Sequence, residues 1–356
     1  MKVLNLNYLF LCLLLYIGFN YNQAQGNNTT LYKTEKINIK PDQFNIWGNL
    51  YIPSTGDKHP VIIFVAGDGN SSREESFLLL KSYGYFDLFI QSGFALLIDE
   101  KPGSGKSTGE FTRGNLFHER AGIVAAWIEK LKNHSSINSN QIGLAGGSQA
   151  GYVMPLVYEM NKNVAFLICQ SCPAMNSIKQ SAYLIEEQSL CVGLKPSEAK
   201  KAFNYYVQSC MASTYSEYLD AATSLANNPI VKALGWDYIQ AKEEFVPISD
   251  NSESLFDPTG ILKKVKIPVL ALYGMKDKLV DPNQGYEVYK KVLTDSGNKL
   301  SLVKLIPDVD HMLTVAKTGC LTEMMQKRQK QEIKLCEEAS TTVDKWLKSL
   351  MEYFNN

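Results

Sequence analysis

In Gln141-Ile-Gly-Leu-Ala-Gly-Gly-Ser-Gln-Ala-Gly151 an apolar strand pattern changes into a helical pattern around one serine, Ser148. Two glycines precede the serine, and Ala150 and Gly151 follow it. A serine on a sharp turn from strand to helix needs small neighbours, since larger side chains would collide where the backbone doubles back. The stretch therefore predicts a nucleophilic Ser148. The alternative is a glycine-rich turn in which the serine only caps the helix.

Strand and helix patterns alternate on both sides of this stretch. Residues 61–65 form a continuous apolar run, which is typical of a strand buried on both faces. The rhythm predicts a mostly parallel, doubly wound sheet whose ligand site lies at the carboxyl ends of its strands. The other predicted elements are a hairpin of strands 35–39 and 46–52, helix 76–91, strand 94–98, helix 115–132, strand 141–145, helix 149–160, strand 164–169, strand 267–273, helix 284–293, strand 300–306 and helix 341–353.

Residues 175–262 interrupt the alternation. They contain helical patterns and no strand pattern, and they are too many for a simple connection. We therefore expect a helical cap inserted into a core formed by residues 26–174 and 263–356. The predicted cap helices are 182–190, 197–211 and 216–225.

An acid and a histidine follow the serine in the chain. Asp277 comes four residues after the resumed strand, in a turn loosened by a glycine. Asp281 is the competing carboxylate, and we interpret it as the cap of the next helix. His311 follows the last strand, where a loop can deliver it to Ser148. The other three histidines do not follow strand ends; they are His59, His118 and His134.

The motif Gly146-Gly147-Ser148-Gln149-Ala150 resembles the G-x-S-x-G nucleophile elbow of the α/β-hydrolase family, with Ala150 in place of the last glycine. Ser148, Asp277 and His311 stand in the family's chain order, and the resemblance covers residues 35–352. It implies the α/β-hydrolase fold. It also implies that His311 takes the proton from Ser148 while Asp277 orients the imidazole.

The resemblance further implies an oxyanion hole made of two backbone N–H groups. One belongs to Gln149, directly after the nucleophile. The other belongs to Asp68, because Ala66-Gly67-Asp68 occupies the place of the family's H-G-x, with Ala66 replacing the usual histidine.

A second glycine-rich stretch, residues 102–108, looks like a phosphate-binding P-loop. Glu100, however, stands where the first glycine of that motif is required, and a carboxylate facing phosphate would repel it. Residues 99–107 instead resemble the D-x-R-G-x-G-x-S turn after the fourth strand of α/β-hydrolases. We therefore expect a structural turn beside the pocket.

The N-terminus differs in composition from the rest of the chain. Lys2 precedes the apolar run 8–19, and a small residue, Ala24, follows a short polar stretch. Residues 1–24 therefore predict a cleaved signal peptide and a secreted or periplasmic protein. The alternative is an uncleaved anchor, although the run is short for a membrane span. The 36 basic and 36 acidic residues balance, so nothing indicates a nucleic-acid partner.

Six cysteines follow the predicted signal peptide, which permits auxiliary disulfides in an exported protein. The expected local pairs are Cys191 with Cys210 and Cys320 with Cys336. The remaining two form a C-x-x-C at positions 169–172, directly after a strand and without a second metal-binding cluster. We expect them to be buried structural thiols.

These patterns predict an exported serine hydrolase that cleaves a carboxylic ester of a small substrate, without a metal or organic cofactor. A peptidase, a thioesterase or an acyltransferase is the alternative on the same fold. An aminopeptidase would need an acidic anchor for the substrate amine, which Glu186 and Glu187 could supply. A non-catalytic binding protein is the alternative of another class, and the intact order of Ser148, Asp277 and His311 argues against it.

Overall fold

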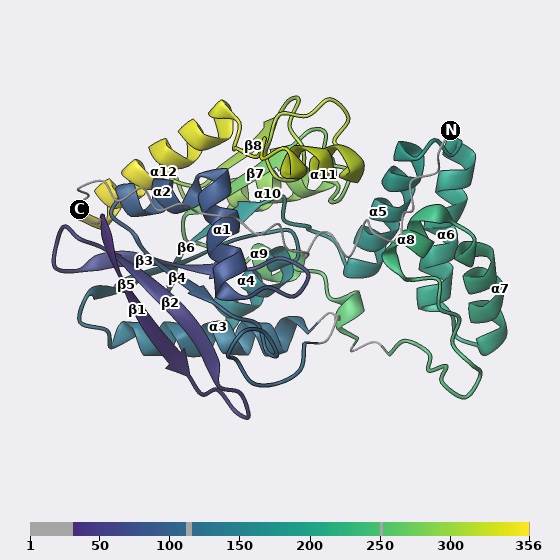
Figure 1. Ribbon diagram of the computed structural model, residues 1–356, viewed down its shortest axis with the longest axis horizontal. Helices are drawn as coiled ribbons and strands as arrows, with labels where there is room; N and C mark the ends of the chain where they lie inside the picture. The colour runs from purple at the N-terminus through teal and green to yellow at the C-terminus, as the bar shows by residue number, and fades with distance from the viewer. Residues whose placement is uncertain (1–30, 112–115, 250–251, 356) are drawn as a thin grey trace.

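The computed structural model describes residues 31–111, 116–249 and 252–355, so the predicted signal peptide lies outside the described residues. Its centre is an eight-stranded sheet with the strand order β1-β2-β4-β3-β5-β6-β7-β8 (Figure 1). The strands are β1 (Tyr32–Ile39), β2 (Ile46–Pro53), β3 (His59–Val65), β4 (Ala95–Asp99), β5 (Ile137–Gly147), β6 (Val164–Gln170), β7 (Val269–Gly274) and β8 (Leu302–Ile306).

The pairing of the strands confirms the mostly parallel sheet. β1 pairs with β2 and β2 with β4 in antiparallel fashion, whereas the pairs from β4 to β8 are parallel. All six residues of β7 are buried, as expected for a strand covered on both faces. The carboxyl ends of β3, β5, β6, β7 and β8 therefore meet at one edge of the sheet.

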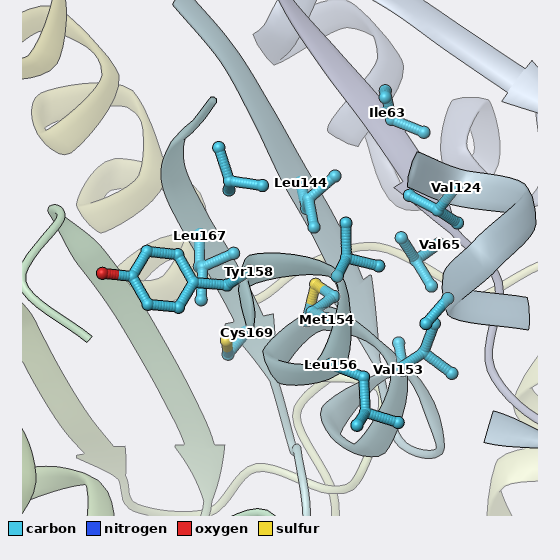
Figure 2. Packing of buried hydrophobic residues seen from close by; sticks show 14 of the residues in the cluster. Ile63, Val65, Val124, Leu144, Val153, Met154, Leu156, Tyr158, Leu167 and Cys169 are labelled. Carbon is cyan, nitrogen blue, oxygen red and sulfur yellow. The ribbon is translucent and has the colours of Figure 1, made fainter. Parts of the chain in front are cut away.

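Helices cover both faces of the sheet, and each face has its own apolar core (Figure 1). α3 (Phe117–Lys132), α4 (Ala150–Met160) and α10 (Pro282–Ser296) pack on one face. Figure 2 shows Met154 and Tyr158 of α4 among the buried side chains of this face, with Leu144 of β5 and Leu167 of β6. The opposite face is covered by α1 (Arg73–Tyr83), α2 (Tyr85–Gln91) and α12 (Glu337–Asn355).

The helix predicted over residues 76–91 is wrong as a single element. Gly84 ends α1 in the left-handed conformation, with φ of 92°, and its N–H bonds to the Lys81 carbonyl. The chain then starts α2 in a new direction. Because a glycine inside a helical pattern can either continue the helix or end it, only the packing of the two segments decides between these outcomes.

After β6 the structure describes four consecutive helices, α5 to α8, which stand beside the sheet domain in Figure 1. They share a small core that includes Ile185, Leu225 and Val231. The chain returns to the sheet through the 3-10 helix η3 (Glu253–Leu255) and α9 (Thr259–Leu262). The four helices are α5 (Ser177–Cys191), α6 (Pro196–Met211), α7 (Tyr215–Ala226) and α8 (Pro229–Leu234).

A disulfide joins this helical segment to the sheet domain. Cys191 at the end of α5 pairs with Cys320, the residue before α11 (Leu321–Gln329), across 129 positions. The predicted local pairs, Cys191 with Cys210 and Cys320 with Cys336, are therefore wrong. α5 packs against the loop before α11, whereas Cys210 lies on α6, and Cys210 and Cys336 carry free thiols.

Cys169 and Cys172, the two cysteines of the C-x-x-C motif, are buried and carry free thiols, as predicted. Among the helices that the structure describes, none is long and apolar enough to cross a membrane.

Candidate active site

Ser148 lies between the end of β5 and the start of α4, with a positive φ of 54°. That backbone conformation is costly for a residue with a side chain and is typical of a nucleophile elbow. The neighbours must be small: a Cβ added to Gly146 would lie 2.4 Å from the Val65 carbonyl oxygen, and one added to Gly151 would lie 2.7 Å from the Cys172 Cβ. α4 has no side-chain cap, so Ser148 does not serve as one.

Asp277 and His311 are joined by a buried hydrogen bond. The loop after β7 carries Asp277, and the loop after β8 carries His311; the Asp277 Oδ2 to His311 Nδ1 distance is 2.8 Å. The other carboxylate oxygen accepts the backbone N–H groups of Leu279 and Val280 at 2.8 and 2.9 Å. Because Asp277 is 1% and His311 6% exposed, little water competes for this contact. The Asp277 carboxylate is therefore held in an orientation that faces the Nδ1 atom of His311.

The competing carboxylate has the structural role that the sequence suggested. Asp281 caps α10, and its Oδ1 accepts the N–H groups of Asn283 and Gln284, both at 3.1 Å. The three other histidines are also engaged elsewhere: His59 with the Gly93 carbonyl, His118 with Glu253 and His134 with Glu35.

Gln170, at the end of β6, links Ser148 to the loop that carries His311. Its carbonyl accepts the Ser148 N–H at 3.0 Å, and its side-chain amide donates to the His311 carbonyl at 3.0 Å. Ser171 Oγ donates to the same carbonyl. Within the described residues, Ser148 Oγ and the His311 ring make no direct hydrogen bond, and catalytic contacts of this kind often tighten only around a substrate.

The pKa of His311 lies above its usual value of 6.5. Burial of the imidazole opposes its charged form, but the charge of Asp277, its hydrogen bond and the charge of Asp310 together raise the pKa more than burial lowers it. The environment thus favours the imidazolium that forms when the ring accepts a proton.

The loop after β3 lies against the elbow. A Cβ on Gly67 would come within 3.5 Å of the Ser148 Cβ. Asp68 follows Gly67 in this loop, and its carboxylate accepts the side-chain amide of Gln149 at 3.4 Å. The structure therefore brings the two residues predicted for the oxyanion hole, Asp68 and Gln149, into side-chain contact with each other beside Ser148.

Sequence reasoning missed two cations beside this loop. Lys101 Nζ donates to the carbonyls of Gly67 and Gly69 at 2.5 and 2.6 Å, and Arg120 donates to the Ala66 carbonyl. Lys101 occupies the arginine position of the D-x-R-G-x-G-x-S resemblance, which is the only signal that could have identified it. Nothing local distinguishes Arg120 from other basic residues of α3.

The P-loop-like stretch binds its own carboxylate. Glu100 Oε2 accepts the N–H groups of Lys106 and Ser107 at 2.8 and 3.0 Å and the Ser107 hydroxyl at 2.9 Å. Arg73 forms an ion pair with the other oxygen at 2.8 Å. The donors that a phosphate would use are therefore taken, in agreement with a structural turn.

The two glutamates that could bind a substrate amine are already paired with lysines. Glu186 and Glu187, the predicted amine anchors, form ion pairs with Lys200 at 3.1 Å and Lys278 at 2.5 Å, respectively.

In the part of the chain that the structure describes, no group of three or more His, Cys, Asp or Glu side chains is arranged to hold a metal ion.

Comparison with solved structures agrees with this architecture. An esterase from Pyrococcus furiosus superposes with a TM-score of 0.54 at 16% identity, over 89% of this chain and 91% of the esterase. An acylaminoacyl peptidase from Pyrococcus horikoshii gives 0.50 at 14% identity, over 86% of this chain but only 41% of the peptidase. At such identities the likeness concerns the fold alone. No curated protein sequence matches the chain.

A family model, the X-Pro dipeptidyl-peptidase (S15 family), matches residues 42–306, which is most of the chain. The matched region includes Ser148 and Asp277 and ends before His311. The eight-stranded sheet, the elbow and this match together lead to one assignment: the chain belongs to the X-Pro dipeptidyl-peptidase (S15) family of serine hydrolases, which have the α/β-hydrolase fold.

Proposed function

We propose that this serine hydrolase cleaves a carboxylic ester through an acyl-enzyme, with Ser148 as nucleophile, His311 as general base and acid, and Asp277 as the group that orients the imidazole. The observation that carries the proposal is the buried 2.8 Å contact between Asp277 and His311, at the same sheet edge as the strained Ser148. Such a constellation is characteristic of acyl transfer.

The chemistry follows from the positions of these groups. Ser148 Oγ attacks the ester carbonyl carbon while its proton passes to His311 Nε2, since Nδ1 is held by Asp277. The negative carbonyl oxygen accepts the backbone N–H groups of Gln149 and Asp68. The imidazolium then protonates the leaving alkoxide, which leaves an acyl-Ser148. Water then attacks the acyl carbon while His311 takes its proton. The bond to Ser148 Oγ breaks, His311 returns the proton to Ser148, and the carboxylic acid is released.

A peptidase is the second candidate, because the matching family model over residues 42–306 is that of a dipeptidyl-peptidase. A peptidase that recognises a free N-terminus needs an unpaired carboxylate for the amine. Glu186 and Glu187 are already paired with lysines, so neither of these two is a free anchor.

We also propose that the protein is exported. The predicted signal peptide at residues 1–24 and the disulfide between Cys191 and Cys320 support this location, since disulfides persist mainly in oxidising compartments. Mass spectrometry of the protein from the medium and from cell extracts tests it: export predicts a mature chain that begins near residue 25, and an intact Met1 on cell-associated protein contradicts it.

Labelling with a fluorophosphonate probe tests the nucleophile. Wild type should be labelled at Ser148, whereas Ser148→Ala and His311→Ala should both remain unlabelled. A panel of p-nitrophenyl esters and X-Pro-p-nitroanilides then separates the two candidates: faster turnover of the nitroanilides would overturn the ester proposal in favour of the peptidase. Wild type that neither labels nor turns over any substrate would contradict both.

A further inference from the structure

The loop after β3 must present the Asp68 N–H to the oxyanion, and its backbone is intrinsically free to do otherwise. Glycines stand at positions 67 and 69, and Gly69 has a φ of 88°. Peptide groups flanked by glycine can rotate with little steric cost. A rotated peptide would turn its carbonyl towards Ser148 and remove the donor. Something outside the loop must therefore fix its orientation.

Lys101 supplies that restraint. The carbonyl of Gly67 and the N–H of Asp68 belong to one planar trans peptide, so they point in opposite directions. Because Lys101 Nζ holds the Gly67 carbonyl at 2.5 Å and the Gly69 carbonyl at 2.6 Å, the Asp68 N–H is directed away from the lysine. No residue in the described part of the chain accepts a hydrogen bond from this N–H.

Arg120 acts on the preceding peptide. It donates to the Ala66 carbonyl and, at 2.5 Å, to the Gln149 side-chain oxygen, so it connects the loop after β3 to the residue after the nucleophile. Two consecutive carbonyls of the loop, those of Ala66 and Gly67, are thus held from outside the loop by cations.

The charges around Lys101 fit a role in holding carbonyls. Burial lowers the pKa of its ammonium well below the usual range, Arg120 acts in the same direction, and Asp68 and Asp99 oppose them. A neutral amine retains two N–H donors, and two carbonyls are bound. Both contacts can therefore persist in either protonation state of the lysine.

We propose that Lys101 is a positioning residue, which orients the Gly67–Asp68 peptide so that its N–H completes the oxyanion hole. The inference rests on the proposed function, since it needs an oxyanion to be formed at Ser148. It concerns transition-state stabilisation and not substrate binding. Loss of one oxyanion donor typically costs about 10²- to 10³-fold in kcat.

The test compares Lys101→Met, Lys101→Arg and Lys106→Met with wild type, using p-nitrophenyl acetate. Lys101→Met should lower kcat by about 10²- to 10³-fold with little change in KM. Lys101→Arg should recover most of the activity, since a guanidinium also carries several N–H donors. Lys106→Met is the matched control, because Lys106 is an exposed lysine of the same turn, and it should retain the wild-type kcat.

A transition-state analogue gives a readout that a merely structural role would not change. A trifluoromethyl ketone forms a tetrahedral oxyanion on the serine. The affinity of Lys101→Met for this inhibitor should therefore fall by about the same factor as its kcat. Fluorophosphonate labelling distinguishes a failure of the proposed function from a failure of the role proposed for Lys101. Wild type without labelling or turnover overturns the proposed function, whereas an active wild type with an equally active Lys101→Met overturns only the positioning role.

Lys101→Met could be unfolded, which circular dichroism would show. A second variant, Lys101→Gln, is used in that case. Lys101→Gln keeps a neutral N–H donor group of shorter reach, and it should fall between wild type and Lys101→Met in kcat. A folded Lys101→Gln with unchanged kcat, or a loss confined to KM, would contradict the positioning role.

Discussion

The carboxyl edge of the sheet and the four-helix segment α5–α8 are built in different ways. At the sheet edge, Ser148, Asp277 and His311 follow strands whose apolar cores cover both faces. The helical segment has a small core of its own. It is fastened to the sheet domain largely by polar contacts of α5 and by one disulfide. The positions of Ser148, Asp277 and His311 are thus fixed by the sheet, whereas the helical segment is held to it by α5.

That attachment reaches the acid loop directly. Tyr183 OH donates to the Asp277 carbonyl at 2.9 Å, Gln180 donates to the Leu279 carbonyl at 2.5 Å, and Gln188 donates to the Lys278 carbonyl at 3.0 Å. α5 therefore contacts the loop that carries the proposed triad acid, Asp277. We therefore expect changes at the sheet edge to affect kcat, and changes at the attachment of α5 to affect stability and KM.

The largest effect is expected at the acid. Asp277→Asn keeps the shape of the side chain but stabilises the wrong tautomer of His311, so kcat should fall by about 10³- to 10⁴-fold. Ester hydrolysis under saturating substrate measures it, with a thermal melt to verify folding. A loss of less than tenfold would mean that Asp277 is not the group that orients the imidazole.

Removal of the disulfide should act on stability instead. Cys191→Ser opens a link across 129 positions, and we expect a loss of about 2–4 kcal/mol in the free energy of unfolding, with kcat nearly retained. Urea unfolding and ester kinetics measure the two quantities. Cys210→Ser, at a free thiol on α6, is the matched control with a small effect. A large loss of kcat in Cys191→Ser would show that α5 takes part in catalytic geometry.

The pH profile should report His311. The general base must be neutral, and its pKa is raised above 6.5 by Asp277 and Asp310 despite burial. kcat/KM should therefore fall about tenfold per pH unit below a midpoint that lies above pH 6.5. The same raised pKa stabilises the folded state at pH values below 6.5, and this contribution is lost as pH rises through the folded-state pKa. A midpoint below pH 6.5 would contradict the raised pKa of His311.

The smallest effect is expected at the competing carboxylate. Asp281→Ala removes the cap of α10 and should cost about 1 kcal/mol in the free energy of unfolding, with kcat unchanged. Thermal melts and ester kinetics measure both. If Asp281→Ala reduced kcat as strongly as Asp277→Asn, the roles of the two acids would have to be exchanged.

Much of the fold was predictable because its signals are local. A buried parallel strand is a short apolar run, an elbow needs small residues around its serine, and a helix cap is a carboxylate just before the first turn. Ser148 could be singled out from these signals, whereas the choice of Asp277 and His311 also used the resemblance to the chain order of α/β-hydrolases. Asp281 could be recognised as a cap in the same way, from its place directly before Pro282.

The remaining features depend on which segments meet in space. The pairing of Cys191 with Cys320 requires α5 to pack on the loop before α11, and the role of Lys101 requires the turn after β4 to lie against the loop after β3. Neither contact has a periodic signal, because the partners are far apart in the chain. The chemical groups and their order along the chain are therefore readable from the residues, whereas the contacts that hold these groups in place are not, since long-range contacts form only when the sheet and its helices pack together.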